Sequence, residues 1–154
     1  MMITDCEQMI AEKPVKYSQD FYQKPLCVKE ENGLYSDLTY QIIGALYEVH
    51  QNLGSVHKEI VYQKAAAMVF REKNIKFVEE AAIPVMFKGQ KIGVYRPDFI
   101  VEDKVILELK AVPMITKAML DQIYYYMNGS VFQLVLLANF GTPRLRIKRR
   151  IFTL

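Results

Sequence analysis

The stretch of sequence that decides the fold reads Arg96-Pro97-Asp98-Phe99-Ile100-Val101-Glu102-Asp103-Lys104-Val105-Ile106-Leu107-Glu108-Leu109-Lys110. Apolar runs on either side of a charged turn predict two strands joined as a β-hairpin. Successive side chains of a strand point to opposite faces, so Glu108 and Lys110 share one face while Leu107 and Leu109 share the other. The second strand therefore presents an acidic and a basic group on one face.

The length of the turn decides where Asp98 lies. With a three-residue loop over 102–104, Val101 pairs with Val105, and Asp98 then lies directly opposite Glu108. A two-residue loop would leave the two carboxylates offset. Both registers are compatible with the sequence.

Facing carboxylates repel each other, and a strand pair does not gain stability from them. A hard divalent cation, Mg²⁺ or Mn²⁺, removes that conflict because it takes oxygen ligands and keeps several waters. Metal-bound water becomes more acidic and can attack a phosphodiester, while Lys110 orients that water or stabilises developing charge. The alternative is a solvent-facing strand with an ordinary Glu-Leu-Lys and an unrelated aspartate.

Periodicity extends the prediction outward from the hairpin. The chain order is two helices, a three-strand meander, a helix and two strands, which predicts an α/β sandwich with a mixed sheet flanked by helices. The expected elements are helices over 38–54, 55–73 and 115–128 and strands over 82–87, 92–101, 105–112, 131–139 and 144–152. In the first two helices the apolar positions at helical spacing are Leu38, Ile42, Ala45, Leu46 and Val49, then Ile60, Val61, Ala65, Met68 and Val69. Ser55 is the expected N-cap of the second helix.

Residues 1–37 differ from the rest, because Pro14, Pro25 and Gly33 interrupt them and no period is sustained. We predict an extension over 1–37 that packs on the core or orders against a partner, followed by one domain over 38–154. A helix is expected near Asp5–Glu12.

Charge divides the chain in the same way. Residues 1–37 carry a net charge of −3 and residues 38–154 a net charge of +6. A basic body suits a polyanionic partner such as nucleic acid, although a solvated final strand with basic ends would give the same composition. With no apolar run near the roughly 20 residues of a membrane span and no signal peptide, we expect no membrane association and a cytoplasmic location. Cys6 and Cys27 are expected to be reduced.

The motifs resemble those of a known family. Pro97-Asp98 with Glu108-Leu109-Lys110 resembles the signature of the PD-(D/E)XK nuclease superfamily. Gln122 and Tyr126 resemble the Gln-x-x-x-Tyr motif of its RecB-like branch. Residues 53–62 resemble the motif that names the GxxExxY family of small bacterial proteins, although Val56 stands where the first glycine would fall. The resemblance runs from about residue 38 to the end of the chain, and the Asn139-Phe140-Gly141 step also fits it.

The resemblance implies a restriction-endonuclease-like core and a Mg²⁺- or Mn²⁺-dependent nuclease that cuts nucleic acid, with DNA as the expected substrate. It implies that Asp98, Glu108 and Glu59 hold the metal and that Lys110 is catalytic. Gln122 and Tyr126 would position these groups or the strand being cut, and strand geometry adds the carbonyl of Leu109 as a metal ligand.

A different class of function stays open: a non-catalytic module that binds nucleic acid or protein on the same fold, because function belongs to the site rather than to the fold. A homodimer is also compatible with the sequence, since small nucleases that cut duplexes often work as dimers. Metal binding distinguishes the enzyme from the binding module.

Overall fold

A computed structural model of the chain describes residues 33–127 and 130–152. The helix expected near Asp5–Glu12, the two cysteines and the last residue of the helix expected over 115–128 lie outside this part. The elements are α3 (Ser36–Leu53), α4 (Glu59–Glu72), β1 (Phe77–Glu79), β2 (Ile83–Phe87), β3 (Gln90–Tyr95), β4 (Phe99–Val101), β5 (Val105–Lys110), α5 (Lys117–Met127), β6 (Leu134–Asn139) and β7 (Arg146–Ile151).

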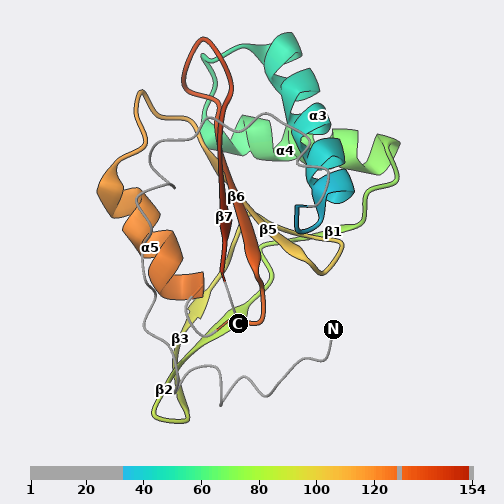
Figure 1. Cartoon of the computed structure of the whole chain (residues 1–154). Helices are drawn as coiled ribbons and strands as arrows, with labels where there is room; N and C mark the ends of the chain where they lie inside the picture. The colour runs from blue at the N-terminus through green and yellow to red at the C-terminus, as the bar shows by residue number, and fades with distance from the viewer. Residues whose placement is uncertain (1–32, 128–129, 153–154) are drawn as a thin grey trace.

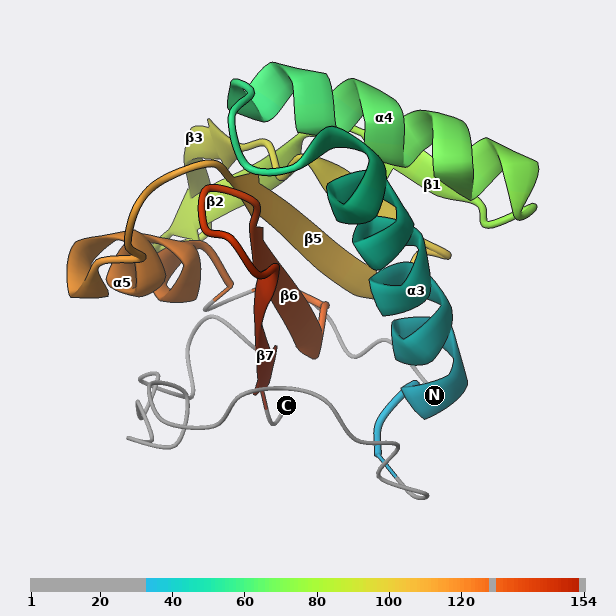
Figure 2. The ribbon, with the colours of Figure 1, turned by 90° about the horizontal axis from the view of Figure 1, so that it is seen from above.

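Five strands form the main sheet, in the order β1-β4-β5-β6-β7, and β2 and β3 form a separate two-stranded sheet. The β5–β6 pair is parallel and its neighbours are antiparallel, so the sheet is mixed. Helices α3 and α4 lie on one face of the sheet and α5 on the other (Figures 1 and 2). The expected α/β class, a mixed sheet flanked by helices, is confirmed.

Strand alternation divides the core into two layers. Leu107 and Leu109 of β5 pack with the α3 and α4 side chains, whereas Ile106 packs with Tyr124 of α5. Strand β6 lies between β5 and β7 and is buried at every position, as its apolar sequence predicts. Glu108, the one acidic residue of β5, shares its face with Ile106.

The meander prediction was wrong in one respect: the strand expected over 92–101 is two strands in two sheets. Pro97 separates β3 from β4, because proline cannot donate to a ladder and restricts the residue before it. The break turns β2 and β3 out of the main sheet. Their place beside β4 is taken by β1, a three-residue strand that the sequence analysis missed.

The apolar positions expected for the second helix only partly face the core, where Ala65 and Val69 pack against it. Helix α4 begins at Glu59 rather than near Ser55, and its N-cap residue, Lys58, makes no side-chain cap. Ile60 and Met68 are exposed, and the buried face consists of Tyr62, Gln63, Ala66, Ala67 and Phe70. The helix carries apolar residues on several sides, so periodicity alone could not identify the face that packs.

The loop before α4 is held by a tyrosine instead of a helix cap. The Tyr62 hydroxyl donates to the Gly54 carbonyl at 2.6 Å and accepts from the His57 amide at 3.2 Å. Its ring stacks on Phe140, with 4.4 Å between centroids. Two segments that the sequence analysis singled out separately, 53–62 and 139–141, therefore meet in space.

The end of β6 is fastened to the end of β5 by one buried side chain. The Asn139 amide donates to the Val112 carbonyl at 2.9 Å, and its oxygen accepts from the Val112 amide at 3.1 Å and from the Gly141 amide at 3.0 Å. The next residue, Phe140, donates its amide to the Lys110 carbonyl at 2.7 Å. These bonds fix the chain directly after Lys110.

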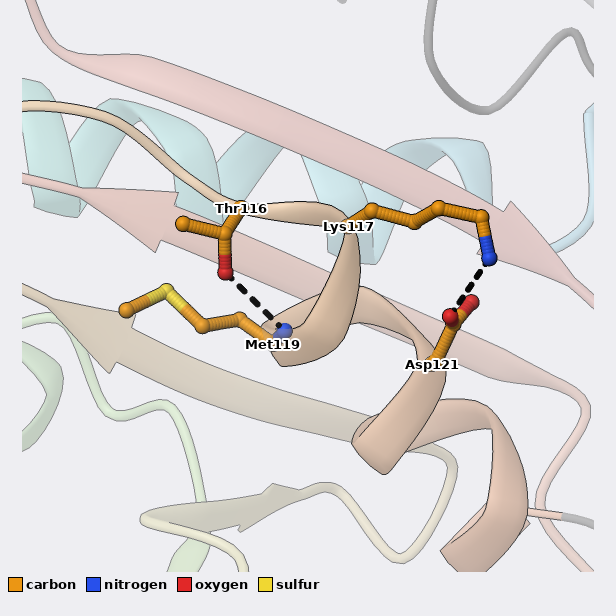
Figure 3. A network of polar contacts seen from close by, with 4 residues as sticks. All are labelled: Thr116, Lys117, Met119 and Asp121. Carbon is orange, nitrogen blue, oxygen red and sulfur yellow. Dashed lines mark hydrogen bonds and ion pairs between the residues drawn. The ribbon is translucent and has the colours of Figure 1, made fainter.

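Helix α5 begins two residues later than expected, because Thr116 caps it (Figure 3). The Thr116 hydroxyl accepts from the Met119 amide at 3.3 Å, which satisfies one of the free N–H groups of the first turn. Lys117 and Asp121, one turn apart, form an exposed ion pair at 2.6 Å. Across the described part of the chain, no helix combines the length and apolar character needed to cross a bilayer.

Gly141 gives the first testable prediction. A Cβ atom there would lie 2.4 Å from both the nitrogen and the oxygen of Val112 and 2.7 Å from the carbonyl carbon of Ala111. We expect Gly141→Ala to lower the free energy of unfolding by about 3 kcal/mol in urea denaturation, because backbone must move.

Gly44→Ala is the matched control. A Cβ at this helical position has no neighbour within 4 Å, so we expect unchanged or slightly increased stability, by up to about 1 kcal/mol. Equal stabilities of the two variants would contradict the close packing of the β6–β7 turn on Val112.

Candidate functional site

The β4–β5 register brings the two carboxylates of the site together. Val101 pairs with Val105 and Phe99 with Leu107, so the three-residue loop is confirmed and the two-residue alternative is wrong. Glu102 and Asp103 of the loop have positive φ angles. One position beyond the last pair, Asp98 lies opposite Glu108.

Asp98 is fixed by the backbone of the facing strand. Its Oδ2 accepts the Leu109 amide at 2.7 Å. Its carboxyl group is also within hydrogen-bonding reach of the Glu108 carboxyl group. Pro97 before it is buried, whereas Asp98 is half-buried and retains access to solvent.

Glu108 has a partner that the sequence analysis missed. The buried Tyr95 hydroxyl at the end of β3 donates a short hydrogen bond to Glu108 Oε1. The Tyr95 ring stacks on Tyr126 of α5, with 4.4 Å between centroids and an angle of 2° between planes. Strand β3 reaches the Glu108 face of β5 only because the chain breaks at Pro97. The spacing of residues along the sequence therefore could not predict the contact between Tyr95 and Glu108.

Burial changes the pKa of both carboxyl groups. Burial, and next the charge of Asp98, raise the pKa of Glu108 to about 8. Burial also raises the pKa of Asp98, although the Leu109 amide acts in the opposite direction. Burial and the adjacent Glu108 raise the pKa of Tyr95, which keeps the phenol protonated as a donor. The pair therefore favours holding a proton, or another cation, over carrying two bare charges.

Lys110 and Glu59 border this pair from two elements. Lys110 is the last residue of β5 and lies on the same face as Glu108. Glu59 is the first residue of α4, and burial raises its pKa while Lys110 lowers it and Asp98 raises it. Glu59 is therefore close enough to interact electrostatically with Lys110 and with Asp98.

The structure does not bring all the predicted residues into contact. Within residues 33–127 and 130–152, no group of three or more carboxylates, histidines or cysteines is arranged to hold a metal. Asp98 and Glu108 meet, but Glu59 does not join them as a third member. Tyr126 reaches the site through Tyr95, whereas Gln122 is exposed on α5.

The chemistry of the donor set fits a hard cation. Two adjacent carboxylates with raised pKa values supply oxygen atoms that repel each other when both are ionised. Carboxylate, carbonyl and water oxygens are the ligands that suit Mg²⁺ and Mn²⁺. The set could also share a proton as a general acid–base pair.

Comparison with known proteins identifies the family. The sequence profile of the PD-(D/E)XK nuclease superfamily matches residues 36–150. Searches among curated proteins and among solved structures gave no match. The matched region contains every described helix and strand except the final residue of β7, and the chain therefore belongs to the PD-(D/E)XK nuclease superfamily.

Proposed function

We propose that the protein is a nuclease that hydrolyses phosphodiester bonds of DNA with a divalent metal ion, Mg²⁺ or Mn²⁺. The observation that carries the proposal is the meeting of Asp98 and Glu108 across the hairpin, with Lys110 on the same face. A buried pair of like charges lowers stability, so its presence is better explained by a bound cation than by folding.

Asp98 and Glu108 would hold the metal through carboxylate oxygens, and the Leu109 carbonyl is the third ligand we propose. The N–H and C=O of one strand residue point to the same side, and the Leu109 amide points to Asp98. The neighbouring Lys110 carbonyl points the other way, to the Phe140 amide. The Leu109 carbonyl is therefore directed toward the carboxylates, beyond the last β4–β5 pair.

When bound, the metal would acidify a water molecule and offset charge on the phosphoryl oxygens. The chain supplies the other functions. Lys110 brings a positive charge to the face where negative charge develops on the phosphate. Tyr95 acts as a positioning residue, because its hydroxyl donates to Glu108 Oε1 while the same carboxyl group lies within hydrogen-bonding reach of Asp98.

The finer family assignment and three site residues are part of the proposal. We assign the chain to the GxxExxY group, with Glu59 approaching the metal, directly or through water, when substrate binds. Tyr126 supports Tyr95 by stacking. Gln122, exposed one helical turn earlier, would contact the substrate strand.

Isosteric variants test the catalytic assignment. We expect Asp98→Asn, Glu108→Gln and Lys110→Met each to lower DNA cleavage in millimolar Mg²⁺ or Mn²⁺ by at least about 100-fold. Asparagine still accepts the Leu109 amide, so the fold should persist, which circular dichroism can verify. Tyr95→Phe keeps the ring stack and removes only the hydroxyl, so a smaller loss is expected.

Asp103→Asn and Lys104→Ala are the controls, because both residues are exposed in the loop at the opposite end of β5. They should retain full activity. A wild-type protein that cleaves no DNA, or site variants as active as these controls, would contradict the assignment and favour a binding module.

The raised pKa of Glu108 predicts how stability depends on pH without metal. The folded-state pKa of about 8 exceeds the ordinary glutamate pKa of 4.5, so the folded protein holds the proton more tightly. The stabilisation is complete below about pH 4.5 and is lost as the pH rises toward 8. Relative to wild type, Glu108→Gln should therefore gain stability across this window, on the order of a few kcal/mol.

Chemical denaturation at several pH values measures this difference. Adding Mg²⁺ at pH 8 should stabilise the wild type and leave Glu108→Gln nearly unchanged, because the metal binds the deprotonated pair. Parallel stability profiles for the two proteins would show that the Glu108 carboxyl group is not perturbed by its site.

A further inference from the structure

The β2–β3 hairpin is a separate structural unit that extends from the catalytic face. Its two strands pair only with each other, with one register shift between Val85 and Met86. Figure 1 shows the hairpin leaving the main sheet on the side of α5. A lone two-stranded hairpin is marginally stable in water, so both its anchoring and its exposure need an explanation.

The base of the hairpin is fixed to the site. Tyr95, the last residue of β3, is buried, bonds Glu108 and stacks on Tyr126. Ile83, its partner across the hairpin, packs against the α5 layer of the core. The direction in which the hairpin leaves is therefore set by the residue that contacts a proposed metal ligand.

The tip of the hairpin is exposed and basic. Lys88 lies in the two-residue turn, Lys91 is the second residue of β3, and both are exposed. Residues 81–97 include three basic side chains and no aspartate or glutamate. Phe87, which is 57% exposed, lies beside Lys88, whose ammonium is 5.4 Å from the ring centroid. Cations beside an exposed aromatic ring suit a nucleic acid, which offers phosphates and base faces together.

We propose that the β2–β3 hairpin is an arm that binds the nucleic-acid substrate at a distance from the phosphodiester bond that is cleaved. Lys88 and Lys91 contact backbone phosphates there. This inference rests on the proposed function of the Asp98–Glu108 site. Lys91 is four residues from Tyr95, so it lies roughly 13 Å along the strand.

A second copy of the chain is a less favoured occupant of this surface. Pairing two hairpins edge to edge through their tips would bring together side chains of one sign with no acidic residue between 81 and 97 to offset them. Like charges placed opposite one another destabilise a strand pair. A polyanion has the complementary charge.

The salt dependence of binding tests the arm. A labelled DNA duplex of roughly 20 base pairs is titrated without divalent cations, so that no strand is cut, and fluorescence anisotropy gives the affinity at several KCl concentrations. Each phosphate contact contributes about 0.9 to the slope of log affinity against log salt, so Lys88→Ala/Lys91→Ala should reduce the slope by about 1.8.

The control is Lys76→Ala/Lys104→Ala, which removes the same charge at the opposite end of the sheet. Lys76 precedes β1, where its amide donates to Glu102, and Lys104 lies in the β4–β5 loop. This double variant should keep the wild-type slope. Equal slopes for the two double variants, or no binding by the wild type, would overturn the proposal.

Cleavage by the wild type separates the two claims. If the wild type cleaves DNA but the Lys88→Ala/Lys91→Ala variant (the arm variant) keeps the wild-type slope of log affinity against log salt, the proposed role of the hairpin is wrong. The proposed nuclease activity is then unaffected. If the arm variant loses slope but the wild type never cleaves, the hairpin binds nucleic acid and the proposed catalysis fails. Loss of self-association in the arm variant with an unchanged slope would assign the hairpin to a second copy instead.

Discussion

The main physical constraint on this structure is the repulsion between two carboxylates, which the β4–β5 register places side by side. A three-residue loop places Asp98 opposite Glu108, and burial raises the pKa of both. The chain offsets this cost with one backbone amide to Asp98 and one phenol to Glu108. Neither the amide nor the phenol carries a positive charge, so the two carboxylates still repel each other when both are ionised. A bound cation would remove this repulsion, which is the physical basis of the proposed metal site.

The surrounding structure fixes the segments that carry the site. Asn139 joins the ends of β5 and β6, and Gly141 lets the following turn approach Val112. Tyr62 holds the loop from which α4 delivers Glu59, and Phe140 supports its ring. Residues outside the Asp98–Glu108 pair thus determine where the proposed metal ligands lie. Rigid support of this kind is what a site needs when it must keep like charges at short range.

Local rules predicted the elements that alternate or repeat within one segment. The β4–β5 hairpin, the buried β6 strand and the inner face of α3 follow from apolar pattern and periodicity, and each is confirmed. The sequence left two registers of that hairpin open, and the three-residue loop decides between them. The rest depends on tertiary contacts. Pro97 splits one apolar run between two sheets, α4 has apolar residues on several sides, and Tyr95 meets Glu108 only after that split. The boundary between residues 1–37 and the domain stays a prediction.

Metal binding tests the central claim most directly. Metal-free wild-type protein and its Asp98→Asn variant are titrated with Mn²⁺ in a calorimeter at a pH above the Glu108 pKa of about 8. We expect saturable binding by the wild type, with release of protons at lower pH, and no binding by the variant. Equal binding by both proteins would place the metal elsewhere, and no binding by the wild type would contradict a metal site at the hairpin.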